Sequence, residues 1–259
     1  TLLQQPCVGQ VAGLGVSTAQ AGFDDAFAVE PVIARETSLG PRAQRGVSLS
    51  EVVMSVVDAL NVAHLVVERP LGNEAVDAES GEVLFARHAD SRRYPASITK
   101  VMTLYLAFEA LSQGKLHLND TIIVSRRAAG QAPTKLGLKA GSRITVDQAM
   151  RAVSVKSAND MATALAEKIG GSETRFATMM TLRAHELGMV NTHFSNASGL
   201  PDKRQLSSAR DIAILSRAVM RDYPQYYAYF GQHDWAFEGR GYRNTNGLLH
   251  SGDGYDGIK

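Results

Sequence analysis

The order of its secondary-structure signals constrains this chain most: a long block with helical periodicity stands between two strand-like segments. Before the block, residues 73–90 form two short runs around a turn at 79–81, which predicts a strand pair with Val83 and Phe85 on one face. After it, residues 234–259 mix aromatic residues with glycine, as strands and tight turns do. This order predicts an α+β domain in which a helical cluster packs on a mostly antiparallel sheet made from both chain ends.

Within the block, apolar residues recur at spacings of three and four in stretches that end at glycine or proline. Thr145 and Gln148 form the capping-box pattern that starts one of these helices. Helices are therefore expected over residues 94–111, from residue 145 onward, and over 158–171, 172–188 and 207–224.

The first 70 residues carry weaker signals. Residues 1–46 sustain neither a helical nor a strand period, and Val11–Ala21 is similar to the tail of a secretory signal that ends in a small-x-small cleavage pattern. Apolar spacings of three and four predict an amphipathic helix, or a helix running into a strand, over residues 49–63. We therefore interpret residues 1–70 as a leader or linker, partly disordered, and residues 71–259 as the functional domain.

Composition excludes several classes of function. Charged residues make up 20% of the chain and nearly cancel, to a formal charge of +1, and no basic run or RNA-binding motif occurs, so nucleic acid is not an expected partner. No stretch approaches the roughly 18 to 20 apolar residues that a membrane span needs. The single cysteine, Cys7, excludes an internal disulfide and a cysteine-based metal cluster.

Ser97 and Lys100 lie three residues apart at the start of the helix expected over 94–111. Residues i and i+3 share a helix face, so Ser97 Oγ and Lys100 Nζ come within hydrogen-bonding reach. Serine is a weak nucleophile that needs a base, and lysine serves as one only when burial or a second cation lowers its pKa. Free N–H groups in the first helical turn stabilise an oxyanion there. The pair therefore has the parts of an acyl-transfer site.

The spacing alone leaves other interpretations open. Residues 112–115 repeat the S-x-x-K pattern around a glycine that ends a helix, and a capping serine followed by a solvated lysine produces it equally well. Ser157 and Asn159 stand in S-x-N spacing at the start of the next helix, where both residue types also serve as caps. Lys259, after a turn at Asp256 and Gly257, is open to interpretation as a terminal charge in solvent.

Together these elements resemble the penicillin-recognising serine enzymes, whose signatures S-x-x-K, S-x-N and K-T-G occur in this order. Within that group the chain is most similar to the D-alanyl-D-alanine carboxypeptidases, the low-molecular-weight penicillin-binding proteins. The resemblance covers about Glu74 to Lys259 and includes the phrases YPASITKVMT, VKSANDMATALAE, HFSNASGLPD and RNTNGLL. It implies a β-lactamase/transpeptidase-like fold, with an antiparallel sheet and a helical cluster.

The resemblance also implies a reaction. A Ser97 acyl-enzyme would hydrolyse the terminal D-Ala-D-Ala bond of peptidoglycan stem peptides, and β-lactams would acylate the same serine. Lys100 would act as the base, and Ser157 would pass a proton to the leaving D-alanine. Asn159 would bind the substrate backbone and help hold Lys100. Lys259 would attract the terminal carboxylate and lower the pKa of Lys100. No metal or organic cofactor is implied, and such an enzyme acts in the periplasm or elsewhere in the cell envelope, in peptidoglycan biosynthesis and cell shape.

The third signature is incomplete, because Lys259 is the last residue of the sequence. In the family the following residues carry a second oxyanion-hole N–H, and further strands complete the sheet. We therefore expect this sequence to be a piece of a longer enzyme, without its C-terminal strands. A C-terminal amphipathic region of the kind many relatives carry would add a peripheral membrane contact.

Other enzymes and one non-enzyme remain as alternatives. A β-lactamase needs a glutamate to activate water, and the loop after the helical block offers only Asp202. A non-catalytic penicillin-binding sensor would be acylated without turnover, which kinetics alone distinguishes. A zinc carboxypeptidase would need paired ligands, but the seven histidines form no H-x-H, H-x-x-x-H or HExxH pattern. A lipase-like hydrolase would need G-x-S-x-G, which the sequence lacks.

Overall fold

The computed structural model describes residues 32–34, 51–55, 72–251 and 254–259, with side chains from residue 72 onward. The helices among these residues are η1 (Ala96–Ile98), α1 (Thr99–Ser112), α2 (Arg126–Ala129), α3 (Val146–Val155), α4 (Asn159–Gly170), α5 (Glu173–Glu186), α6 (Ala209–Asp222), η2 (Pro224–Tyr229) and η3 (Gly247–His250). The strands are β1 (Val32–Ala34), β2 (Glu51–Ser55), β3 (Asn73–Asp77), β4 (Val83–Arg87), β5 (Thr121–Ile123), β6 (Arg143–Thr145), β7 (Asp234–Phe237), β8 (Arg240–Arg243) and β9 (Tyr255–Ile258).

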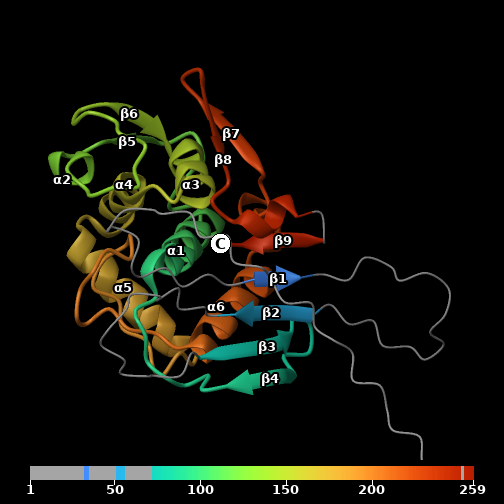
Figure 1. Ribbon diagram of the computed structural model, residues 1–259. Coiled ribbons are helices and arrows are strands. Elements are labelled where there is room, and N and C mark those ends of the chain that lie inside the picture. The colour runs from blue at the N-terminus through green and yellow to red at the C-terminus, as the bar shows by residue number, and fades with distance from the viewer. Residues whose placement is uncertain (1–31, 35–50, 56–71, 252–253) are drawn as a thin grey trace, which may run out of the picture.

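Strands from both ends of the chain lie side by side in the order β9, β1, β2, β3, β4 (Figure 1). Each hydrogen-bonded pair in this array is antiparallel, with Val32 opposite Ile258 and Val53 opposite Ala75. Helix α6 packs against β3, where Arg210 forms an ion pair with the buried Glu74. The predicted strand pair around residues 79–81 and the predicted antiparallel sheet are therefore confirmed.

The N-terminal part differs from the expectation. A helix over residues 49–63 is wrong for Glu51–Ser55, which form β2 and pair with β3 along their whole length. Its β-branched residues suit a strand, and the pairing with β3 outweighs the helical spacing. Val32–Ala34 form β1, which is too short for a sequence period to reveal. Cys7, the Val11–Ala21 segment and residues 56–71 lie outside the described residues.

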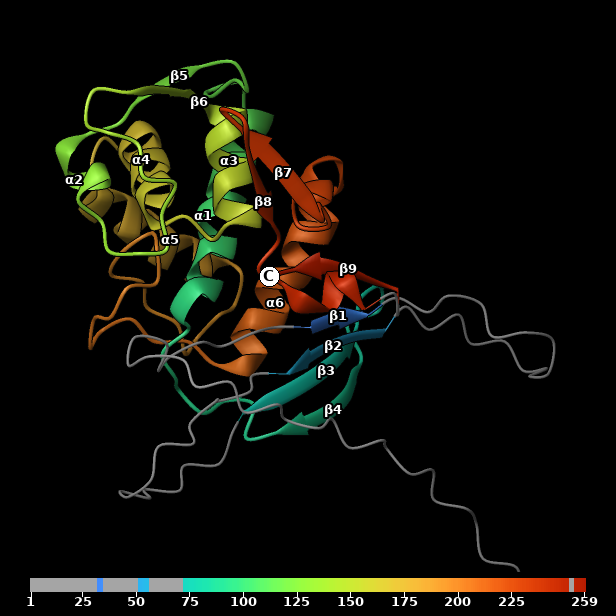
Figure 2. The same ribbon diagram turned by 45° about the horizontal axis from the view of Figure 1, so that its top comes forward.

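Helix α1 is the centre of the helical cluster, among α3, α4, α5 and α6 (Figure 2). Residues 99 to 108 are all buried and most of them are apolar, as a helix enclosed by others requires. Phe108 has no exposed surface and packs against the rings of Tyr226 and Phe230. This central position fixes the N-terminal end of α1 in the middle of the domain.

The helix boundaries follow local sequence signals. The predicted capping box is confirmed: Gln148 N donates to Thr145 Oγ1 over 3.2 Å, and Thr145 N donates to Gln148 Oε1 over 3.0 Å. Helix α4 ends at Gly170, and its C-terminal cap, Gly171, adopts a left-handed conformation with φ of 76° that glycine tolerates. Among the described residues, no helix has the length and apolar character needed to cross a bilayer.

Candidate active site

Ser97 lies in the short turn η1, directly before the buried helix α1. Pro95 precedes this turn, and Ala96 has a left-handed backbone with φ of 44°, an uncommon conformation for a residue other than glycine. The serine hydroxyl therefore stands at the N-terminal end of a helix, where unpaired N–H groups and the helix dipole favour negative charge.

Lys100 is completely buried, one helical turn after Ser97. Its Nζ lies 3.2 Å from Ser97 Oγ and donates to Ser198 O over 2.5 Å. Burial lowers the pKa of Lys100 well below the usual range of lysine, and the nearby charge of Lys259 lowers it further. A lowered pKa favours the neutral amine, which is the form that is able to accept the proton of a hydroxyl.

Ser157 lies at the junction of α3 and α4 and is 5% exposed. Its φ of 59° is left-handed, a strained conformation for serine that surrounding structure must hold in place. Within the described part of the chain, the buried Ser157 Oγ has no hydrogen-bond partner. A strained backbone and an unsatisfied buried hydroxyl are both typical of a functional site.

Asn159, the first residue of α4, differs in part from the expectation. Its Nδ2 donates to Ala132 O over 3.0 Å and to Pro133 O over 3.1 Å. In the part of the chain that the structure describes, Lys100 Nζ is hydrogen-bonded to Ser97 and Ser198 and not to Asn159. Its backbone N donates to Thr134 O over 2.7 Å, so Asn159 holds the segment from Ala132 to Thr134, and the backbone carbonyl of Ser198 holds Lys100 instead.

Lys259 follows strand β9 and is 5% exposed, which rules out a terminal charge in solvent. Its Nζ donates to Val153 O over 2.9 Å and to Ser154 O over 3.3 Å, carbonyl groups in the last turn of α3. The C-terminal end of a helix favours a cation because its carbonyl groups are unpaired and carry partial negative charge. The end of β9 thus lies near the N-terminal end of α1, so that the charge of Lys259 acts on Lys100 although the two residues are far apart in the sequence.

The second S-x-x-K pattern, at residues 112–115, lies in a different environment. Ser112 closes α1, and Gly114 has a left-handed φ of 66° in the exposed turn that follows. Lys115 is exposed, whereas Lys100 is completely buried. Among the described residues, no group of three or more His, Cys, Asp or Glu side chains is arranged to hold a metal ion.

Comparison with known proteins identifies the family of the chain. The profile of D-alanyl-D-alanine carboxypeptidases matches residues 74–259. The chain belongs to this family. It is 38% identical to D-alanyl-D-alanine carboxypeptidase DacA of Haemophilus influenzae over 177 residues, which cover 67% of this chain and 45% of the relative.

Solved structures of penicillin-binding proteins share the fold of this carboxypeptidase family member. Penicillin-binding protein 5 of Haemophilus influenzae matches with a TM-score of 0.67 and 36% identity, over 71% of this chain and 56% of that one. Penicillin-binding protein D2 of Listeria monocytogenes, in an ampicillin-bound form, matches with a TM-score of 0.65 and 28% identity. The match covers 73% of this chain and 77% of that one. The expected β-lactamase/transpeptidase-like fold is thus confirmed. The chain spans about half the length of the curated relatives it matches.

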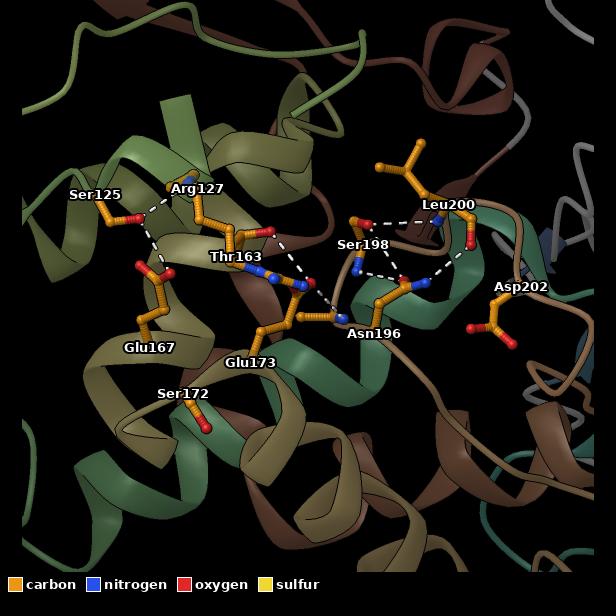
Figure 3. Close-up of polar contacts among 12 residues, drawn as sticks. Ser125, Arg127, Thr163, Glu167, Ser172, Glu173, Asn196, Ser198, Leu200 and Asp202 are labelled. Atoms are coloured by element: carbon orange, nitrogen blue, oxygen red, sulfur yellow. Dashed lines mark hydrogen bonds and ion pairs between the residues drawn. The ribbon is translucent and has the colours of Figure 1, made fainter. Parts of the chain in front are cut away.

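In this carboxypeptidase family member, the loop 195–200 is a part of the site that the sequence reasoning did not assign. Asn196 Oδ1 accepts from Ser198 N and from Gly199 N over 3.2 and 2.8 Å, and Asn196 Nδ2 donates to Leu200 O over 2.9 Å (Figure 3). The loop therefore has a fixed shape that presents Ser198 O to Lys100. The phrase HFSNASGLPD marked this region, but a carbonyl acceptor has no signature of its own in a sequence.

A pocket of about 260 Å³ lies between this loop and the turn that carries Ser97. Its walls include Pro95 and Ala96 on one side and Leu200 and Pro201 on the other, so they are mostly apolar. Such a pocket beside the nucleophile has room for an apolar group of a substrate.

Proposed function

We propose that this protein hydrolyses the terminal D-Ala-D-Ala bond of peptidoglycan stem peptides through a Ser97 acyl-enzyme, and that β-lactams acylate the same residue. The observation that carries the proposal is a completely buried lysine amine 3.2 Å from a serine hydroxyl at a helix N-terminus. The family of D-alanyl-D-alanine carboxypeptidases and an ampicillin-bound relative support the substrate class.

In the acylation step, neutral Lys100 accepts the proton of Ser97 Oγ as this oxygen attacks the carbonyl of the penultimate D-alanine. The tetrahedral oxyanion forms at the N-terminal end of α1, where backbone N–H groups stabilise it. Ser157 Oγ, whose hydroxyl has no partner among the described residues, donates its proton to the departing D-alanine nitrogen and takes up the proton held by Lys100, which becomes neutral again. Water then releases the shortened peptide from Ser97.

Asn159 and Lys259 are assigned to binding. The amide nitrogen of Asn159 is used by the loop carbonyls, so its Oδ1 is the atom that accepts from the substrate backbone. Lys259 provides the cation that attracts the terminal carboxylate of the peptide, and its charge also keeps the pKa of Lys100 low. Lys259 therefore supports both binding and catalysis.

The catalytic domain is assigned to residues 71–259, with residues 1–70 as a preceding segment whose strands β1 and β2 add to the sheet of that domain. The family model matches residues 74–259. Because peptidoglycan lies outside the cytoplasmic membrane, the site of action is the cell envelope. The stem peptide and β-lactams are the proposed partners, and the chemistry of the site uses protein side chains and water.

Release of free D-alanine from a D-Ala-D-Ala-terminated peptide tests the proposal. The full-length enzyme should release D-alanine, and its Ser97→Ala variant should not. Covalent penicillin labelling without D-alanine release would favour a penicillin-binding sensor. Rapid β-lactam turnover would favour a β-lactamase. Release that persists in Ser97→Ala would contradict the proposal.

A further inference from the structure

Glu173 is a buried carboxylate for which the proposed mechanism has no use. It is the first residue of α5, after the N-cap Ser172, and its side chain is 3% exposed. Arg127 from α2 forms an ion pair with its Oε2 over 2.8 Å, and Thr163 from α4 donates to its Oε1 over 3.3 Å (Figure 3). Only the carboxylate of this ion pair is buried: the Arg127 side chain is 62% exposed, and an ion pair with a solvent-exposed arginine adds little stability. The position of this carboxylate therefore calls for another explanation.

The third partner of Glu173 is the backbone of the loop that holds the catalytic lysine. Ala197 N donates to Glu173 Oε1 over 3.3 Å. Ala197 O accepts from Thr103 Oγ1 over 2.7 Å, and Thr103 lies on α1, three residues after Lys100. Ala197 is completely buried, so no water takes the place of these partners. Both polar groups of Ala197 are thus fixed by helices.

The next carbonyl along the chain, that of Ser198, is the one that accepts from Lys100 Nζ over 2.5 Å. Peptide units are planar and rigid, so fixing Ala197 limits where Ser198 O is able to lie. The Asn196 side chain shapes the same turn from within the loop. Glu173, in contrast, belongs to a helix and ties the turn to the helical cluster.

We propose that Glu173 is a positioning residue for Lys100: its Oε1 holds the Ala197 N–H, and through it the Ser198 carbonyl that keeps Lys100 Nζ beside Ser97 Oγ. This inference rests on the proposed function, because it concerns the base of that reaction. The positioning role requires only an acceptor oxygen for the Ala197 N–H. The negative charge of Glu173 is needed for its ion pair with Arg127.

The kinetics of acylation by a fluorescent penicillin test this role, with the limiting acylation rate separated from the saturation constant. Glu173→Leu removes the acceptor and should lower the limiting rate about 10- to 100-fold, because moving Lys100 Nζ by about 1 Å from its place beside Ser97 Oγ has an effect of this size. The saturation constant should not change, because Glu173 does not contact the substrate. Glu173→Gln retains an acceptor oxygen and should restore most of the rate.

Two further variants complete the design. Glu173→Asp keeps the charge but is one methylene too short to reach Ala197 N, so it should acylate slowly even if Glu173→Leu fails to fold. Glu167→Leu is the matched control: Glu167 is a neighbouring carboxylate on α4 that accepts from Ser125 Oγ over 3.0 Å (Figure 3), and its loss should leave acylation unchanged.

The outcomes separate this inference from the proposed function. Wild-type limiting rates in both Glu173→Leu and Glu173→Asp would overturn the positioning role, while acylation of Ser97 in the wild type would still stand. A loss in Glu173→Gln as large as in Glu173→Leu would also overturn it, because the acceptor oxygen would then be insufficient. If the wild-type chain is not acylated at all, both the proposed function and the role of Glu173 are wrong.

Discussion

Gly199 offers a direct test of how closely the loop 195–200 fits the turn that carries Ser97. Its φ is +87°, and a Cβ added there would overlap the Ala96 carbonyl oxygen and come within 3.0 Å of Ser97 N. Real Cβ contacts essentially never fall below 3.0 Å, so in Gly199→Ala the methyl group and the Ala96 carbonyl must separate by about 1 Å. That carbonyl belongs to the peptide unit of Ser97 N, so the nucleophile moves with it.

The structure gives the size of the expected effect. A displacement of about 1 Å at reacting groups costs roughly 100-fold in rate, or about 2.7 kcal/mol of transition-state stabilisation. The left-handed backbone adds about 1–2 kcal/mol to the loss of stability for any residue with a Cβ. Gly199→Ala should therefore slow acylation by penicillin about 100-fold and also reduce the free energy of unfolding.

Gly188→Ala is the matched control. Gly188 has a φ of +90°, is exposed after α5, and a Cβ there meets nothing within 4 Å. It should lose about 1–2 kcal/mol of stability and acylate at the wild-type rate. Stopped-flow acylation and urea unfolding of both variants separate the two effects. A wild-type acylation rate in Gly199→Ala, or an equal loss in Gly188→Ala, would refute the reasoning.

Three other substitutions probe the charges and the core. Because the charge of Lys259 lowers the pKa of Lys100, Lys259→Met should raise that pKa and move the rising limb of the acylation–pH profile to higher pH; an unmoved profile would contradict this role. Arg210→Met removes the partner 2.6 Å from the buried Glu74 and should cost about 2–4 kcal/mol in urea unfolding at neutral pH. Burial already raises the pKa of Glu74, so this loss should shrink as the pH falls and the carboxyl is protonated; a loss independent of pH would argue against it. Phe108→Ala should cost about 3–5 kcal/mol, and a loss below about 1 kcal/mol would mean that the core around α1 is not packed as described.

The sequence predicts those parts of the structure that depend on near neighbours in the chain. Ser97 and Lys100 are three residues apart, so helical geometry alone places them together. The capping box at Thr145 and Gln148 is likewise local. The position of Lys259 beside the site is not local, and here the resemblance to a known family, not the spacing, carried the prediction.

Interactions between distant backbone groups escaped prediction. The partner of Lys100 is the carbonyl of Ser198, 98 residues away, and every residue has such a carbonyl, so its identity leaves no trace in the sequence. The donors to Glu173 and the acceptors of Asn159 are hidden for the same reason. The apolar spacing in residues 51–55 favoured a helix, but these residues form strand β2 because they pair with β3, a contact that the local sequence does not reveal.

The central claim is that Ser97 is the nucleophile of a penicillin-sensitive acyl transfer. Mass spectrometry of the full-length protein after reaction with penicillin, followed by peptide mapping, tests it most directly. The account predicts one adduct of penicillin mass, located at Ser97 and absent in Ser97→Ala. An adduct on another residue, or no adduct on the folded wild-type chain, would contradict the account.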